Sequence, residues 1–197
     1  MATYDFSKID IIGAALQSFF GGLGAFQSIA DRILGELQYG SRRDDGTYFF
    51  EPERWYPAGP NIRMFELLKE KVGASTLKQA GRSVPENAIF PPGVDTIQKG
   101  LASIDVAYHL NHGQNGKPLM DPATGQIQDI IGQYRVEETP GQNEAHVTSD
   151  TPYPSEFDEG IVSAMARRFE PGARVHLDTS RPNRLNGGDS CTYIVRW

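Results

Sequence analysis

The sequence predicts an α+β fold in which N-terminal helices pack on an antiparallel sheet. Apolar residues in the first half recur at three- and four-residue intervals, which is typical of amphipathic helices. In the second half QIQDIIGQYRVEET and EAHVTSD alternate like strands, SEFDEGIVSAMARRF has a helical pattern, and ARVHLDTS and SCTYIVRW alternate again. This β-β-α-β-β order favours an antiparallel sheet crossed by one helix. Ser155 and Asp158 have the spacing of a capping box at the start of that helix.

The helices expected in the first half have recognisable ends. The pattern predicts a helix over residues 26–39 that Gly40 ends, and after it a turn at DDG leads into the strand TYFFE. A second helix is expected to be capped by Asn61 and ended by Gly73. A short helix over residues 75–81 and a longer one over about 95–112 follow.

The proline-rich segment PERWYPAGP indicates a boundary near residue 60. We therefore expect an N-terminal helical and strand subdomain over residues 1–59 and an α+β domain over residues 60–197. The glycine cluster GGLGAF lacks the features of a phosphate-binding loop and is interpreted as a helix break or a site of close packing.

Composition narrows the class of protein. The 197 residues carry a net charge of −6, and the arginine pairs lie beside acidic residues, which argues against a nucleic-acid partner. One cysteine and the absence of a signal-peptide pattern suggest a cytoplasmic protein. The longest apolar stretch, IDIIGAALQSFFGGLGAF, is interrupted by Gln17 and glycines, so no membrane span is expected.

Two histidines are the first candidates for chemistry. His109 and His112 lie three residues apart near the end of the long predicted helix, a spacing used by metal ligands and compatible with axial heme ligation. The same residues also suit an ordinary helix end, where the helix dipole favours polar and cationic groups. A metal site would need further ligands, and only His146 and His176 remain among the histidines.

No catalytic residue is predicted. The sequence has no G-x-S-x-G motif and no histidine–acid arrangement around Cys191. A thiol inside an apolar strand is typical of a small, unreactive core residue.

The residues TPYPSEFDEGIVSAMARRF, ARVHLDTS and NRLNGGDSCTYIV resemble the C-terminal part of the 4-vinyl-reductase, or hydrocarbon-binding, domain family, which looks related to heme nitric-oxide-binding sensor domains. The resemblance covers about residues 125–197. It implies a bacterial sensor or signalling domain with an apolar ligand pocket, often acting as a dimer. Many family members hold zinc through cysteines, but only Cys191 matches that pattern and Asn183 stands at an upstream position, so no metal site is expected.

The heme-binding relatives use a helical histidine and a Tyr-x-Ser-x-Arg motif that holds the propionates. This sequence has His109 and His112 but no such motif. Heme is therefore an alternative, and the main expectation is that no cofactor is present.

The leading hypothesis is a non-enzymatic binding or sensor domain for a small, largely apolar molecule. We expect its pocket to include Tyr108, His109 and His112 from the long helix, together with Tyr134 and Phe157. It would act as a homodimer or on a separate output protein. The alternatives are a heme-based gas sensor, or an interaction module without a ligand that associates through an exposed IIGAALQSFFGGLGAF surface. A cavity would favour a binding domain, and a filled core an interaction module.

Overall fold

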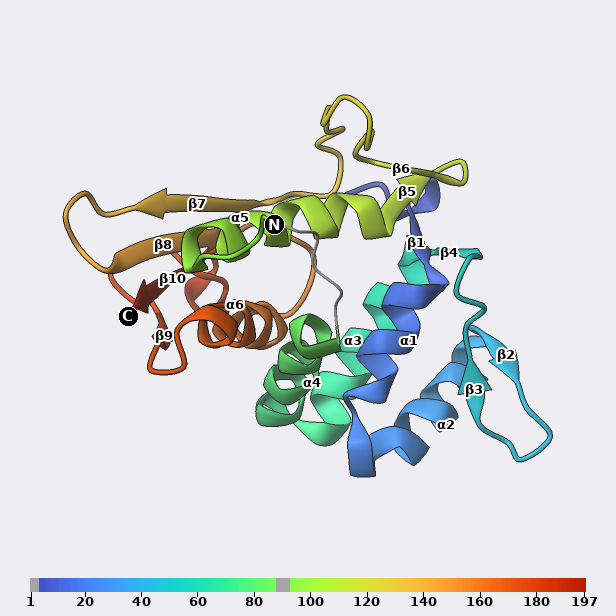
Figure 1. Ribbon diagram of the computed structural model, residues 1–197. Helices are drawn as coiled ribbons and strands as arrows, with labels where there is room; N and C mark the ends of the chain where they lie inside the picture. Colours follow the sequence, from blue (N-terminus) through green and yellow to red (C-terminus); the bar gives the residue numbers. More distant parts are fainter. Residues whose placement is uncertain (1–3, 88–92) are drawn as a thin grey trace.

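The computed structural model describes residues 4–87 and 93–197 (Figure 1). Its helices are α1 (Gly13–Gly21), α2 (Gln27–Leu37), α3 (Ala58–Val72), α4 (Ala74–Asn87), α5 (Ile97–Asn111) and α6 (Ser155–Phe169). Short 3₁₀ turns cover Phe6–Lys8, Gly24–Phe26 and Arg184–Asn186. The strands are β1 (Asp10–Ile12), β2 (Ser41–Arg42), β3 (Tyr48–Phe49), β4 (Trp55–Pro57), β5 (His112–Gln114), β6 (Lys117–Pro118), β7 (Tyr134–Glu138), β8 (Glu144–Ser149), β9 (Arg174–Leu177) and β10 (Cys191–Arg196).

The C-terminal half forms the predicted antiparallel sheet, with strand order β7-β8-β10-β9. Helix α6 lies between β8 and β9 in the sequence and packs against β9 and β10, so the predicted β-β-α-β-β order is confirmed. Ser149 of β8 pairs with Tyr134 on one side and with Cys191 on the other, which aligns the three strands. Helix α5 packs against β7 and α6.

The N-terminal helices reach the sheet through α6. Helix α4 packs along α6, α1 packs on α4, and α2 lies on α3 at the far side of the molecule (Figure 1). A second sheet, β4-β1-β5-β6, joins β1 and β4 to strands that follow α5. Strands from both sides of the expected boundary at residue 60 therefore pair with each other, and the division into two domains stays a prediction.

Glycines allow α4 and α6 to lie backbone against backbone. A Cβ atom on Gly81 would lie 2.2 Å from the carbonyl oxygen of Phe157, and one on Gly160 would lie 2.2 Å from that of Lys78. Gly81 therefore does not end a helix, as the sequence suggested, and α4 continues to Asn87.

Other predicted helix ends also differ from the structure. Helix α3 begins at Ala58, and Asn61 lies inside it with a buried side chain, so Asn61 is not its cap. The capping box at Ser155 and Asp158 is absent, because Pro154 precedes α6 and Asp158 is fully buried. Pro154 fixes its own backbone in a suitable conformation without a side-chain cap.

The glycine-containing N-terminal segment belongs to the core. Leu16, Phe19, Phe20 and Leu23 are buried, and Phe19 contacts the rings of Phe20, Phe65 and Phe157. The expectation that this segment forms an exposed contact surface is therefore wrong. A Cβ atom on Gly22 would collide with Ser83, which confirms close packing at the glycine cluster.

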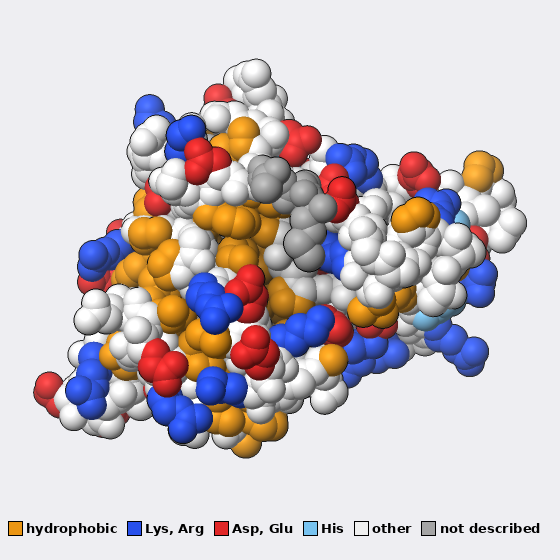
Figure 2. Space-filling model, turned by 180° about the vertical axis from the view of Figure 1, so that it is seen from behind, with side chains coloured by type: hydrophobic (Ala, Val, Ile, Leu, Met, Phe, Trp, Pro, Cys, Tyr) orange, Lys and Arg blue, Asp and Glu red, His pale blue; other side chains and the backbone are white. Residues whose placement is uncertain are grey.

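Apolar side chains do gather on the face of the molecule in Figure 2, between interspersed basic and acidic groups. Within the described residues, no helix combines the length and apolar character that crossing a bilayer requires.

Candidate ligand cavity

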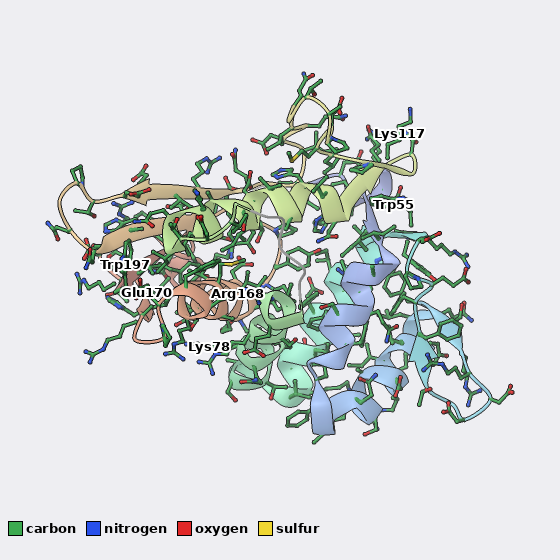
Figure 3. All side chains as sticks on the ribbon, in the orientation of Figure 1. Trp55, Lys78, Lys117, Arg168, Glu170 and Trp197 are labelled. Carbon is green, nitrogen blue, oxygen red and sulfur yellow. The ribbon has the colours of Figure 1, made fainter. Side chains whose placement is uncertain are left out.

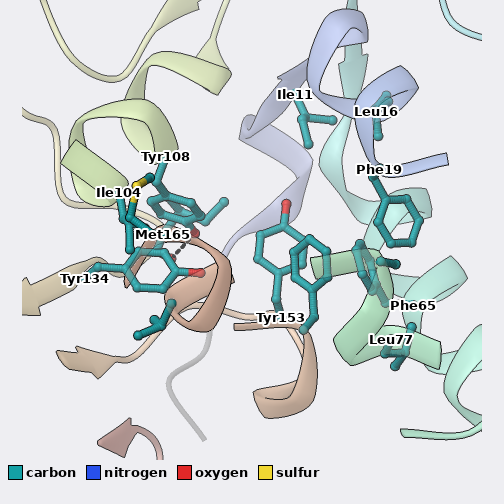
Figure 4. Close-up of a cluster of buried hydrophobic side chains, with 14 of the residues drawn as sticks. Ile11, Leu16, Phe19, Phe65, Leu77, Ile104, Tyr108, Tyr134, Tyr153 and Met165 are labelled. Atoms are coloured by element: carbon teal, nitrogen blue, oxygen red, sulfur yellow. Dashed lines mark hydrogen bonds between the residues drawn. The ribbon is translucent and has the colours of Figure 1, made fainter. Parts of the chain in front are cut away.

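A cavity of about 530 Å³ lies between α1, α3 and the end of α4 on one side and α5 and α6 on the other. Its size falls within the ~300–1,000 Å³ typical of small-molecule sites. Figure 4 shows Ile11, Leu16, Phe19 and Phe65 on one side, Ile104, Tyr108, Tyr134 and Met165 on the other, and Tyr153 between them. Apolar and aromatic side chains dominate these walls, so the cavity favours an apolar ligand.

Four of the five predicted site residues line this cavity. Tyr108, His112, Tyr134 and Phe157 are among its lining residues, whereas His109 is not. His109 lies within α5 and is buried away from the cavity. His112 lies just past the end of the helix in an extended conformation, with φ −105° and ψ 146°. The structure therefore separates the two histidines, which the sequence placed together near the end of the helix.

His112 is held as a neutral imidazole. Its Nδ1 lies 2.7 Å from the backbone carbonyl oxygen of Tyr108. A carbonyl can only accept a hydrogen bond, so Nδ1 carries the proton and Nε2 has the free electron pair. Burial lowers the pKa of His112 to about 4. At neutral pH the ring therefore presents an acceptor nitrogen at the cavity wall.

The hydroxyl of Tyr153 is hydrogen-bonded to Nε2 of His112. It lies 2.6 Å from Nε2 of His112 and donates to it, while accepting a 3.3 Å hydrogen bond from Nδ2 of Asn61. Burial raises the pKa of Tyr153 well above its usual value, so the hydroxyl keeps its proton. Oδ1 of Asn61 is buried without a partner among the described residues. The cavity wall thus contains a polar chain of three side chains with one vacant acceptor.

The pKa of His109 is raised, whereas that of His112 is lowered. Its Nδ1 lies 2.9 Å from the backbone oxygen of Asp105 and 3.4 Å from the Asp105 carboxylate. Burial lowers the pKa of His109, but the hydrogen bonds and charge of Asp105 outweigh this effect, so the pKa is raised overall. The two histidines therefore differ in charge preference as well as in position.

A buried carboxylate lies behind the cavity wall. Asp158 accepts hydrogen bonds from the hydroxyls of Tyr134, Ser149 and Thr151 and forms a 3.0 Å ion pair with Arg184. Burial and the charge of Asp158 raise the pKa of Tyr134 well above its usual value, so this hydroxyl stays a donor.

Arg184 joins this cluster to the backbone of the loop before α6. Its guanidinium donates to the carbonyl oxygens of Ser149, Thr151 and Tyr153. Because Tyr153 contacts His112, the ion pair supports the geometry of the cavity residues.

Cys191 lies outside this site. It is fully buried on β10, with a free thiol, and it pairs with Ser149 across the strands. It is the packed strand residue that the sequence suggested.

Sequence reasoning missed Tyr153, Asn61, Asp158 and Arg184. Asn61 and Asp158 were assigned to helix caps, which are the common local role of these residue types. Tyr153 lies between two prolines in TPYPS, and nothing local places its hydroxyl near a histidine 41 positions away. These contacts depend on tertiary packing.

The fold is similar to that of several solved H-NOX structures. The chain superposes on a structure titled "Probing the function of heme distortion in the H-NOX family", with a TM-score of 0.64, 13% identity and 95% of each chain covered. A point mutant of T. tengcongensis H-NOX gives a TM-score of 0.64 and 13% identity, covering 94% of this chain and 97% of that chain. An Fe(II) unliganded H-NOX mutant from K. algicida gives 0.57 and 15% identity, with 94% and 96% covered.

These likenesses extend over nearly the whole chain and show a shared fold. No family model and no curated protein matches the sequence. The structural comparison supports the expected distant similarity to heme nitric-oxide-binding domains, whereas the 4-vinyl-reductase resemblance stays a prediction.

Proposed function

We propose that this protein is a heme-binding sensor domain, with His112 as the iron ligand. The observation that carries the proposal is a neutral, oriented imidazole nitrogen at the wall of an apolar cavity, in a fold similar to that of H-NOX structures. Heme supplies an iron that accepts an axial nitrogen ligand and can bind small gases. This reverses the order of the sequence-based hypotheses, in which heme was an alternative.

The residues of the cavity fit a heme in three respects. Its walls are apolar, as a porphyrin face requires. The backbone carbonyl of Tyr108 fixes the tautomer of His112, an arrangement common among metal-binding histidines. Lys99 also lines the cavity and could move from Asp95, 2.8 Å away, to an anionic propionate. For His112 to act as the ligand, the Tyr153 hydroxyl must leave Nε2.

Titration with hemin tests the proposal. The wild-type protein should give a Soret band with a defined endpoint at one heme per chain. His112→Ala should abolish the axial-ligand spectrum, and His109→Ala should keep it because His109 lies outside the cavity. Retention of the wild-type spectrum in His112→Ala would assign the ligand elsewhere.

A second candidate is an iron-free apolar molecule, as the sequence first suggested. The 2.6 Å contact between Tyr153 and His112 and the vacant Oδ1 of Asn61 favour it, because a ligand with one donor could complete this chain. Native and denatured mass spectra of freshly purified protein distinguish the two candidates, since an added mass without a Soret band would identify a ligand other than heme.

Both candidates describe a binding domain, and we propose no catalytic step. We propose that ligand occupancy of such a domain is coupled to a second binding site, for a partner. A separate output protein or a second copy of this chain therefore remains part of the proposal.

A further inference from the structure

A second cavity lies between the C-terminal halves of α4 and α6. Its volume is about 410 Å³, and its lining includes Gln79, Arg82, Glu86, Ser163, Arg167 and Arg168. Three arginines against one glutamate give this cavity a formal charge of +2. Lys78 and Arg168 lie on the side of the molecule where α4 and α6 meet (Figure 3). This arrangement differs from the first cavity, whose walls are apolar.

The helix crossing explains why the arginines converge. Gly81 and Gly160 bring the two backbones into contact, and Arg82 directly follows Gly81 on α4. On α6, Ser163 and Arg167 are four residues apart and so lie on one helical face. The close crossing thus places groups from both helices around one space.

Arg82 has a buried donor without a partner, and neither Arg82 nor Arg167 is paired with a described carboxylate. Nε of Arg82 is buried without a hydrogen-bond partner in the part of the chain that the structure describes. The Arg82 guanidinium has a long 3.5 Å contact with Gln79, and Nε of Arg167 donates to the carbonyl oxygen of Ala173. No described carboxylate forms an ion pair with Arg82 or Arg167.

A buried N–H donor without a partner is costly and calls for an explanation. A bound oxyanion supplies one, because guanidinium groups match the geometry of phosphate oxygens and can bind them in pairs. We infer that the cavity between α4 and α6 binds a phosphate group of a small molecule, held by Arg82 and Arg167. This site does not rest on the heme proposal, because its arginines do not line the first cavity, although Pro85 lines both.

Calorimetric titration with inorganic phosphate and with glycerol 3-phosphate tests the inference, at an ionic strength kept constant with sodium chloride. Both probes should bind at one site per chain. Each of Arg82→Gln and Arg167→Gln should weaken binding on the order of tenfold or more, since a hydrogen bond to a charged group contributes about 1.5–3 kcal/mol. Arg42→Gln, an exposed arginine of the β2–β3 hairpin, is the matched control and should bind like the wild type.

Tighter binding of glycerol 3-phosphate would identify an organic phosphate as the ligand, and equal affinities would identify free phosphate. Circular dichroism shows whether each variant is folded. Arg167 is exposed, so Arg167→Gln should fold and still test the inference if Arg82→Gln does not fold. The inference is overturned if neither probe binds, or if folded Arg167→Gln and Arg42→Gln bind phosphate equally.

Discussion

At the scale of single residues, two histidines in one short segment have opposite electrostatic environments. In the described part of the chain the ring nitrogens of His112 are hydrogen-bonded to neutral groups, the Tyr108 carbonyl and the Tyr153 hydroxyl, whereas His109 lies beside the Asp105 carboxylate. The sequence placed both near the end of a helix. It could not separate them, because their partners come from the local backbone geometry and from a distant loop.

This difference predicts how stability depends on pH. The pKa of His112 falls from an ordinary value near 6.5 in the unfolded chain to about 4 in the folded one, because of burial first and the charge of His109 as a lesser cause. The unfolded state therefore binds more protons between these values, and stability falls as the pH drops below about 6.5. The loss approaches on the order of 3 kcal/mol near pH 4.

Urea denaturation between pH 5 and pH 7 measures this loss. His112→Gln should flatten the pH dependence. His109→Gln should instead steepen it, because the raised pKa of His109 contributes stability at low pH that is lost as the pH rises. An unchanged profile in His112→Gln would show that the ring does not stay neutral in the folded protein.

The buried carboxylate makes a second prediction at this scale. Asp158 is fully buried and is the counter-ion of Arg184. Asp158→Asn removes that charge and replaces an acceptor oxygen with a donor, so we expect a loss of about 3–5 kcal/mol in the free energy of unfolding. Asp95→Asn, which breaks an exposed pair with Lys99, should cost less than about 1 kcal/mol. Equal effects of the two substitutions in urea denaturation would contradict the structural role of Asp158.

At the scale of elements, regular patterns predicted most of the architecture. The C-terminal strands and α6 lie where the sequence pattern predicted them. Strand β8 has the alternating burial of a strand with one buried face, whereas β10 and α6 are buried over most of their residues. The errors arose where polar or small residues serve tertiary contacts. Gly81 was interpreted as a helix end, yet it lies inside α4 against Phe157.

The α4–α6 crossing can be tested with a single methyl group. Gly160→Ala would place a Cβ atom 2.2 Å from the carbonyl oxygen of Lys78, so the helices must separate. We expect a loss of about 1–3 kcal/mol, typical of overpacking. Gly21→Ala in α1 is the matched control, because no atom lies within 4 Å of its added Cβ. It should be neutral or slightly stabilising. Thermal unfolding compares them, and equal melting temperatures would contradict the close crossing.

At the scale of the whole molecule, the cavity exists because two groups of helices meet without filling the space between them. Four of its lining residues were predicted from apolar helical faces and alternating strands. The opposite wall, with Asn61 and Phe65 from α3, could not be predicted, since the sequence does not specify how α3 and α5 are placed relative to each other.

Whether the ligand binds in this cavity can be tested by filling the cavity with a larger side chain. Ala107 of α5 lines the cavity and is exposed, so a larger side chain there can enter the open space without displacing the core. Ala107→Trp should leave the melting temperature of the ligand-free protein close to that of the wild type. It should weaken hemin binding on the order of tenfold or more, because the indole occupies apolar surface that the ligand would otherwise bury.

Ala123→Trp is the matched control for this substitution. Ala123 lies in an exposed loop away from the cavity, so the variant carries the same added indole but should bind hemin like the wild type. Equal hemin affinity in folded Ala107→Trp and Ala123→Trp would show that hemin binds elsewhere. Loss of hemin affinity in Ala107→Trp alone would place the ligand between the two groups of helices. A ligand bound there contacts both groups, so any movement of one group relative to the other would depend on whether the ligand is bound.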